Sequence, residues 1–460
     1  MIVRYLDPLE RLEFELIELR ELGLPLPQEQ AEFEKLKAAA TGSENDGLRN
    51  RALEMLTHLA SVPRPAAIQQ HEPNDLAGIQ AECSGHSDFP KPIPHDDRLL
   101  DALKGGWLGR AAGCLLGKPV ERHPRSAIRE ILQANDQWPL DNYFTEKGMP
   151  AEILEKYPWK RRLGRESLRE NIACMPEDDD LNYTMLNLHV LEQHGFQFTP
   201  ADIGIAWLTK LPAYETFTAE RVAYHNLLSG LEPPFSGRTL NPFREWIGAQ
   251  IRADLWGYVC PGDPARAAEL AWRDAVVSHT RNGVYGEMYW AAVLAAAFVE
   301  SDCRALIETG LGFIPAKSRL AQAIQRVLEW PTDREWEDTL DQLETEFGKY
   351  HWVHTINNSA LGAAALLSAE SDFETAICNG VMGGWDTDST GATIGSVMGV
   401  ILGAQALPAK WTRPLQDRIR SSVSGFDNSR FSDLARRSYV QASAKRTDTG
   451  ELHRSSQDDY

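Results

Sequence analysis

Two stripes of glycine at four-residue spacing constrain the fold of this chain more than any other feature. The first stripe is Gly105, Gly109, Gly113 and Gly117, and the second is Gly391, Gly395, Gly399 and Gly403. The second stripe lies in an uncharged run from Thr390 to Leu407. Glycine in a helix interior costs about 1 kcal/mol relative to alanine. Two such stripes are best explained by helices whose backbones pack in close contact.

The long segments of the chain show helical periodicity, and convincing alternating strands are absent. The predicted helices of the main body cover 98–117, 181–194, 201–210, 264–277, 286–300, 316–328, 335–346, 358–368, 372–382 and 390–405. We therefore predict an all-α fold.

The chain divides by composition into four parts. Residues 1–60 show leucines at spacings of three and four and are predicted to form a separate helical appendage. The proline-rich segment 61–97 is typical of a linker or an extended wrap. Residues 98–441 form the predicted main domain, and the charged, serine-rich segment 442–460 is predicted to be a disordered tail.

The composition of the chain limits the classes of binding partner and the cellular compartment that we expect for it. The net charge of −19 argues against nucleic acid or an anionic membrane as the main partner, because both select for basic surfaces. The six cysteines are scattered without CxxC spacing, which fits a reducing, cytoplasmic compartment. The N-terminus lacks the layout of a signal peptide. The run from Thr390 to Leu407 approaches membrane-spanning length, but its glycines and the lack of basic flanks favour a buried helix.

Two clusters of acidic residues stand just before predicted buried helices. The first is Asp386, Asp388 and Ser389, which follow Gly383 and Gly384. Helix capping explains one aspartate well, whereas a cation site explains two acids that share a small volume. Both interpretations remain open for this stretch alone.

The second cluster runs from Glu177 to Asp180 after Pro176. Consecutive carboxylates repel one another, so a fold that turns several of them inward needs a cation to offset their charge. A solvated acidic cap is the alternative. Together, the two clusters supply the carboxylate and hydroxyl oxygens that a pair of hard divalent cations requires. Glu121, just past the first glycine stripe, is a candidate to approach them.

These motifs resemble those of the ADP-ribosylglycohydrolase family, which includes the dinitrogenase reductase-activating glycohydrolases. The stretches that carry the resemblance are, in order, GRAAGCLLGKPVE, PEDDD, GAQIRADLWGYVCPGDPARAAELAWRDAVVSHT and GGWDTDSTGATIGSVMG. The resemblance covers about residues 100–405. It implies an orthogonal multi-helix bundle, a site for two Mg²⁺ or Mn²⁺ ions, and hydrolysis of the bond at C1 of an ADP-ribosyl ribose.

The resemblance also implies roles for individual residues. Metal ligands are predicted at Asp178, Asp179, Asp386, Asp388 and Ser389, with Glu177 as an additional candidate. Glu177 stands where the family has Thr or Ser, and in an alternative register Asp178 takes that hydroxyl position and Asp179–Asp180 form the acidic pair. Catalytic candidates are Asp179, Glu177 and Glu121, and substrate-binding candidates are His279, Gly248, Ala249 and Gln250. Cys114 replaces an acidic residue of the family, and Trp385 is inserted before Asp386.

Two functions of different classes follow. The first is a metal-dependent hydrolase that acts on an ADP-ribosylated protein or a small ribosyl conjugate. The second is a non-catalytic module that retains the fold and binds ADP-ribose, a nucleotide or a protein partner. In either case the N-terminal appendage is a candidate site for docking a partner.

Overall fold

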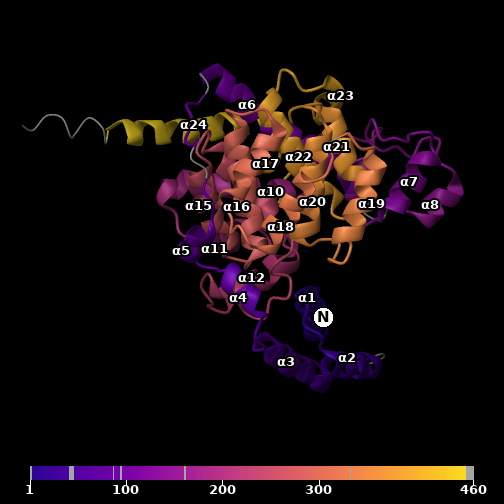
Figure 1. The fold of residues 1–460 in the computed structure, drawn as a ribbon. Coiled ribbons are helices and arrows are strands. Elements are labelled where there is room, and N and C mark those ends of the chain that lie inside the picture. The colour runs from indigo at the N-terminus through magenta and orange to yellow at the C-terminus, as the bar shows by residue number, and fades with distance from the viewer. Residues whose placement is uncertain are drawn as a thin grey trace, which may run out of the picture.

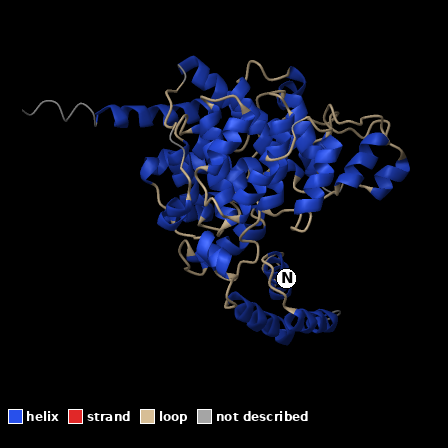
Figure 2. Ribbon diagram, in the orientation of Figure 1, coloured by secondary structure: helices blue, strands red, loops and turns tan. Residues whose placement is uncertain are grey.

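The computed structural model describes residues 3–40, 46–85, 88–93, 96–159, 162–331 and 333–451. Helices make up its regular structure, and no strand occurs in these ranges (Figure 2). The prediction of an all-α fold is confirmed. No helix within the described ranges combines the length and apolar character needed to cross a membrane.

Five helices precede the main body. They are α1 (Pro8–Glu21), α2 (Pro27–Ala40), α3 (Asp46–Ala60), α4 (Ala66–His71) and α5 (Leu76–Glu82). Asp7 caps α1 by accepting a hydrogen bond from the backbone N–H of Leu9, and Pro8 occupies the first turn, where it costs no hydrogen bond.

The main body contains the remaining helices, which run to the C-terminal end of the described chain. They are α6 (Asp96–Gly117), α7 (Arg125–Gln133), α8 (Ala151–Lys156), α9 (Arg162–Glu166), α10 (Asp179–His194), α11 (Pro200–Lys210), α12 (Thr218–Leu228), α13 (Phe235–Arg238), α14 (Ala253–Tyr258), α15 (Pro264–Ala275), α16 (Asn282–Ala297), α17 (Cys303–Leu311), α18 (Arg319–Leu328), α19 (Trp336–Phe347), α20 (Thr355–Ser368), α21 (Phe373–Met382), α22 (Thr387–Leu402), α23 (Ala409–Thr412) and α24 (Phe431–Glu451). The first turns of α24 pack in the core through Phe431 and Leu434, whereas its C-terminal part projects from the body (Figure 1) and includes the first ten residues of the predicted disordered tail. Residues 452–460 lie outside the described residues.

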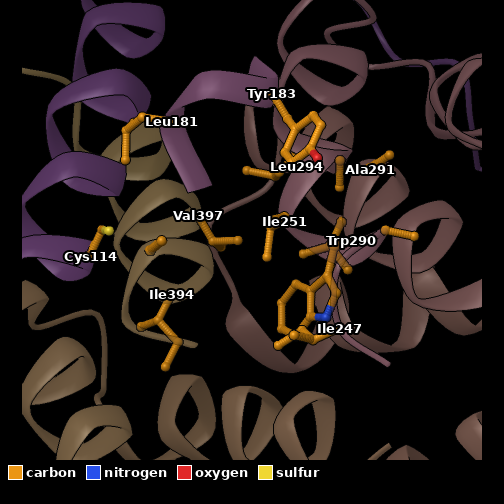
Figure 3. Close-up of a cluster of buried hydrophobic side chains, with 14 of the residues drawn as sticks. Cys114, Leu181, Tyr183, Ile247, Ile251, Trp290, Ala291, Leu294, Ile394 and Val397 are labelled. Atoms are coloured by element: carbon orange, nitrogen blue, oxygen red, sulfur yellow. The ribbon is translucent and has the colours of Figure 1, made fainter. Parts of the chain in front are cut away.

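The two glycine stripes bring α6 and α22 into backbone contact. A Cβ atom added to Gly105, Gly109 or Gly113 would overlap the carbonyl oxygen of Gly399, Gly395 or Gly391, respectively. The order of these pairs shows that the two helices run antiparallel. Around them, the core is continuous: Ile251 lies between Val397 of α22 and Trp290 of α16 (Figure 3).

The N-terminal helices have a small core of their own, and one of them also packs on the main body. Apolar side chains of α1, α2 and α3, such as Leu16, Phe33 and Leu56, form a small core of their own. Figure 1 shows α2 and α3 projecting away from the body, with α1 between them and it. The predicted separation is therefore incomplete, because α1 docks on the body through its polar face.

Buried ion pairs hold α1 in place. Arg244 donates to both carboxylate oxygens of Glu15, at 2.6 and 3.0 Å, and Arg281 donates to Glu18 at 3.0 Å. All four side chains are at least nine-tenths buried. The predicted linker contains α4 and α5, and Glu72 between them pairs with Arg319 of the main body at 2.9 Å. The division of the chain at residues 60 and 97 stays a prediction.

Glu18, Glu21 and His354 approach one another within 4.8 Å at this junction. His354 begins α20, and its Nδ1 accepts the backbone N–H of Ile356 at 3.2 Å. The neutral imidazole must then carry its proton on Nε2, and a protonated nitrogen cannot ligate a metal. This cluster lies where α1 meets the start of α20.

A test of the helix contact is Gly113→Ala. In an isolated helix this change stabilises by about 1 kcal/mol. Here the new methyl group would overlap the backbone of α22, so we expect a loss of about 3 kcal/mol or more. Urea unfolding measures the difference. In the matched control, Gly164→Ala, the new Cβ meets no heavy atom within 4 Å. Equal effects of the two changes would contradict the close contact.

A second test concerns the pH dependence of α1 docking. Burial raises the pKa of Glu21 from 4.5 to about 7. The folded state then binds a proton that the unfolded state releases, so this contribution to stability is present below pH 4.5 and is lost as the pH rises through about 7. In the wild-type protein, the free energy of unfolding should therefore fall as the pH rises across this window. We expect Glu21→Gln to reduce this fall by up to about 3 kcal/mol. Urea unfolding at pH 5 and pH 7.5 provides the measurement.

The control for this change is Glu13→Gln, on the same helix but with an exposed carboxylate that pairs with Lys37. We expect it to leave the pH dependence unchanged. An identical slope for the wild-type protein and Glu21→Gln would show that Glu21 is not the group that titrates.

Candidate active site

One cavity of about 230 Å³ lies where the starts of α10 and α22 meet the loop that follows α6. Acidic side chains dominate its polar wall. They are Glu121, Glu177, Asp178, Asp179, Asp180, Glu215, Glu220, Asp386 and Asp388. The structure thus brings the two acidic clusters and Glu121 to one place.

The start of α10 orients its carboxylates in different directions. Asp178 caps the helix by accepting the backbone N–H of Asp180 at 3.0 Å, and its other oxygen pairs with Lys118. Asp180 is buried and accepts a hydrogen bond from the Ser389 hydroxyl at 3.1 Å. Glu177 instead accepts from the amide of Asn182 at 2.6 Å. Asp178 thus caps the helix, while Asp180 turns toward Ser389 and Glu177 toward Asn182. Both registers of the metal ligands stay predictions.

The start of α22 is not built around a capping aspartate. Asp386 occupies the N-cap position, but its side chain makes no capping hydrogen bond. Its backbone N–H donates to Asn358 of α20 at 3.1 Å, which fixes the chain instead. Gly384 and the inserted Trp385 both have positive φ, at 77° and 59°, and form the sharp turn before α22. The carboxylates of Asp386 and Asp388 are therefore left to face the cavity.

Burial and mutual repulsion perturb these acids. Burial, together with Asp388, raises the pKa of Asp386 well above its usual range, and burial with Glu121 raises the pKa of Asp388 to about 7. Burial raises the pKa of Asp180 to about 6, although Arg110 opposes this shift. Burial beside Asp180 also raises the pKa of Asp179. Each raised pKa indicates that nearby positive charges and hydrogen bonds do not fully offset the cost of burying a negative charge.

The residues present fit a cation. Glu121, Asp386 and Asp388 place oxygen atoms within 4.8 Å of one another, and Asp178 and Asp180 do so with the Cys114 sulfur. Hard divalent cations prefer such oxygen ligands. Burial raises the pKa of Cys114 well above its usual range, so it remains a neutral thiol and a poor ligand. Buried acidic groups of this chain could therefore hold metal ions.

Three of the predicted substrate-binding residues do not reach the cavity. His279 is 1% exposed, and its Nε2 lies 3.9 Å from Glu220, which itself forms the wall. Gln250 accepts hydrogen bonds from Thr355 and Ser359 on α20, and Ala249 is fully buried. Gly248 does line the cavity, where a Cβ would overlap the carboxylate of Glu220.

Several wall residues were absent from the predicted site. Lys118 stands within the GKPVE motif, so its position was visible in the sequence although its pairing with Asp178 was not. Glu220 lies in a stretch without a recognisable motif, and burial raises its pKa to about 7. The aromatic part of the wall includes Tyr5, Phe14, Trp246, His351 and Trp352, together with Phe217. Their clustering depends on contacts distant in sequence.

Comparison with known proteins shows the family of the main domain. The family model described as ADP-ribosylglycohydrolase matches residues 95–447. The chain belongs to the ADP-ribosylglycohydrolase family. The matched range contains both acidic clusters and Glu121, whereas α1 to α5 precede it.

A solved structure supports the fold of this ADP-ribosylglycohydrolase domain. The chain is similar to a structure described as an ADP-ribosylglycohydrolase-related protein complex, with a TM-score of 0.50 and 20% identity over 75% of this chain and 99% of that chain. No curated protein matches the chain.

The acidic cluster predicts how the protein responds to divalent cations. Asp386→Asn removes one poorly compensated charge, so we expect it to stabilise the metal-free protein by on the order of 1 kcal/mol. The same change should abolish most of the rise in melting temperature that Mn²⁺ produces in the wild-type protein. Thermal unfolding in EDTA and in Mn²⁺ measures both effects. Asp338→Asn, on the exposed face of α19, should alter neither.

An Asp386→Asn protein that retains the full Mn²⁺-dependent rise would contradict a cation site at the start of α22. A wild-type protein whose melting temperature is unaffected by Mn²⁺ and Mg²⁺ would contradict the site as a whole.

Proposed function

We propose that this protein is a metal-dependent hydrolase that cleaves the glycosidic bond at C1 of an ADP-ribosyl or related ribosyl conjugate. The observation that carries the proposal is the convergence of Asp179, Asp180, Asp386 and Asp388 with Glu121 on one cavity, inside the ADP-ribosylglycohydrolase domain. A structural role would not require this concentration of acids, three of which are buried, because their repulsion opposes folding.

Two Mg²⁺ or Mn²⁺ ions are the proposed cofactors. Asp178, Asp179, Asp180, Asp386, Asp388 and Ser389 would hold them. When bound, such ions polarise substrate oxygens and offset the charge of the carboxylates. Glu177 is less suited to this role than its neighbours, because the amide of Asn182 already binds its carboxylate.

Side chains on the cavity wall are the proposed groups for proton transfer and for contact with the ribose. Asp179 is the proposed base: it lines the cavity, and burial beside Asp180 raises its pKa, which makes its carboxylate a stronger acceptor for a proton from the attacking water. The new bond joins the water oxygen to C1 as the bond to the leaving atom breaks; the leaving atom keeps the bonding electron pair and takes up a proton, so that one water is consumed in all. Glu121 enters from the loop after α6 and is the proposed contact for the ribose hydroxyl groups. Glu177 remains an alternative base.

A non-catalytic binding module is the second candidate. One observation favours it: the ammonium of Lys118 pairs with Asp178, and an ammonium can balance carboxylates without promoting hydrolysis. In that case the cavity would bind ADP-ribose and release it unchanged.

The test is release of ADP-ribose from ADP-ribosylated arginine, ADP-ribosylated serine peptide and small ADP-ribosyl conjugates, with Mn²⁺ or Mg²⁺ present. We expect the wild-type protein to hydrolyse at least one substrate. Asp388→Asn should lower kcat by at least about 100-fold, because it removes a predicted metal ligand. Asp433→Asn, exposed on α24, is the matched control and should retain activity.

Circular dichroism checks that Asp388→Asn remains folded. Full activity of this variant would contradict the assignment of the site. Binding of ADP-ribose by calorimetry, without turnover of any conjugate, would favour the binding module instead.

A further inference from the structure

The wall of the proposed substrate cavity is not built from the family domain alone. Arg4, Tyr5 and Phe14 line it, and they precede the first residue of the family match, at 95, by about 80 residues or more. Tyr5 comes just before α1, and Phe14 lies in its middle. The N-terminal segment therefore completes a cavity whose acidic floor belongs to the family domain.

The contribution of α1 is aromatic. Phe14 meets Trp246 edge-on, with ring centroids 5.2 Å apart and planes at 90°, and it meets His351 at 5.7 Å and 88°. Trp246 and His351 are stacked, with centroids 4.4 Å apart and an interplanar angle of 6°. All three rings line the cavity, as does the half-buried ring of Trp352. Flat rings that surround a cavity favour a flat aromatic ligand.

The position of this aromatic wall is fixed by charge. Glu15, adjacent to Phe14, receives two hydrogen bonds from Arg244, and Glu18 receives one from Arg281. Removing α1 from the body would leave both arginines without these partners, at a high cost in free energy because they are buried. Phe14 is therefore held in a defined place rather than on a freely moving arm.

We propose that Phe14 and Tyr5 form, with Trp246, His351 and Trp352, an aromatic subsite that binds a planar heteroaromatic ring of the substrate. The N-terminal segment is thus a specificity-determining part of the site. The proposal rests on the proposed function, since it places this ring beside the carboxylates that act at C1. The ring belongs either to the adenine of an ADP-ribosyl group or to an aromatic leaving group.

The decisive variant is Phe14→Leu, which keeps an apolar side chain against Trp246 but removes the flat ring. We expect its dissociation constant for the ring-bearing ligand to rise about tenfold, the usual effect of losing one stacking contact. Phe14→Trp should restore binding. In turnover assays, KM should rise more than kcat falls. Phe235→Leu, an exposed phenylalanine outside the cavity, is the matched control and should bind as the wild type does.

Calorimetry with ADP-ribose and with ribose 5-phosphate identifies the ring. If adenine occupies the subsite, Phe14→Leu weakens ADP-ribose and leaves ribose 5-phosphate unchanged. If the leaving group occupies it, ADP-ribose is unaffected and KM rises only for conjugates with an aromatic leaving group. Unchanged binding and unchanged KM for every ligand would overturn the proposal. Because calorimetry needs no turnover, a Phe14-dependent affinity without hydrolysis would sustain the subsite while contradicting the hydrolase.

Discussion

The contact between α6 and α22 is the constraint on which the site depends. Their glycines let the two backbones touch, and the antiparallel order of the pairs brings the end of α6 to the start of α22. The Thr387 hydroxyl donates to the carbonyl of Gly117 at 2.8 Å, which fixes this register. Lys118 and Glu121 therefore emerge beside Asp386 and Asp388. The stripes that appeared structural in the sequence also set the geometry of the carboxylates.

Charges behind the cavity support the carboxylates on its wall. Arg110 is fully buried and donates to the carbonyl of Asp180 and to the carboxylate of Asp254, at 2.9 and 2.6 Å. Arg252, also fully buried, donates to Glu220 at 2.9 Å and to Asp274 at 3.0 Å. Buried charges are tolerated only when they are paired in this way. These arginines hold the backbone of α10 and the side chain of Glu220 in place, but they leave Asp386 and Asp388 uncompensated.

The sequence predicted most of the helices of the main body, because their apolar positions repeat with the helical period. It also predicted that two acidic helix starts meet, since both precede buried helices. It left the register at Glu177 to Asp180 open, because four adjacent acids carry no local signal of which ones turn inward. In the structure, Glu177 accepts a hydrogen bond from Asn182, five residues further along the chain, whereas Asp180 accepts one from Ser389, which lies more than 200 residues away. His279 lies behind Glu220, which comes from a stretch without a motif, so its position relative to the cavity could not be predicted from the sequence.

The polar face of α1 shows why the docking of the N-terminal segment escaped prediction. Glu15, Glu18 and Glu21 repeat every three residues opposite the leucines, a pattern that normally indicates a solvated helix face. Here the same face is buried against arginines more than 200 residues away in the chain. An amphipathic pattern indicates which face of a helix is apolar. It does not indicate whether the polar face is exposed to water or packs against groups of opposite charge. In this protein, the polar face of α1 packs against arginines, and this packing brings aromatic side chains from outside the family domain to the cavity.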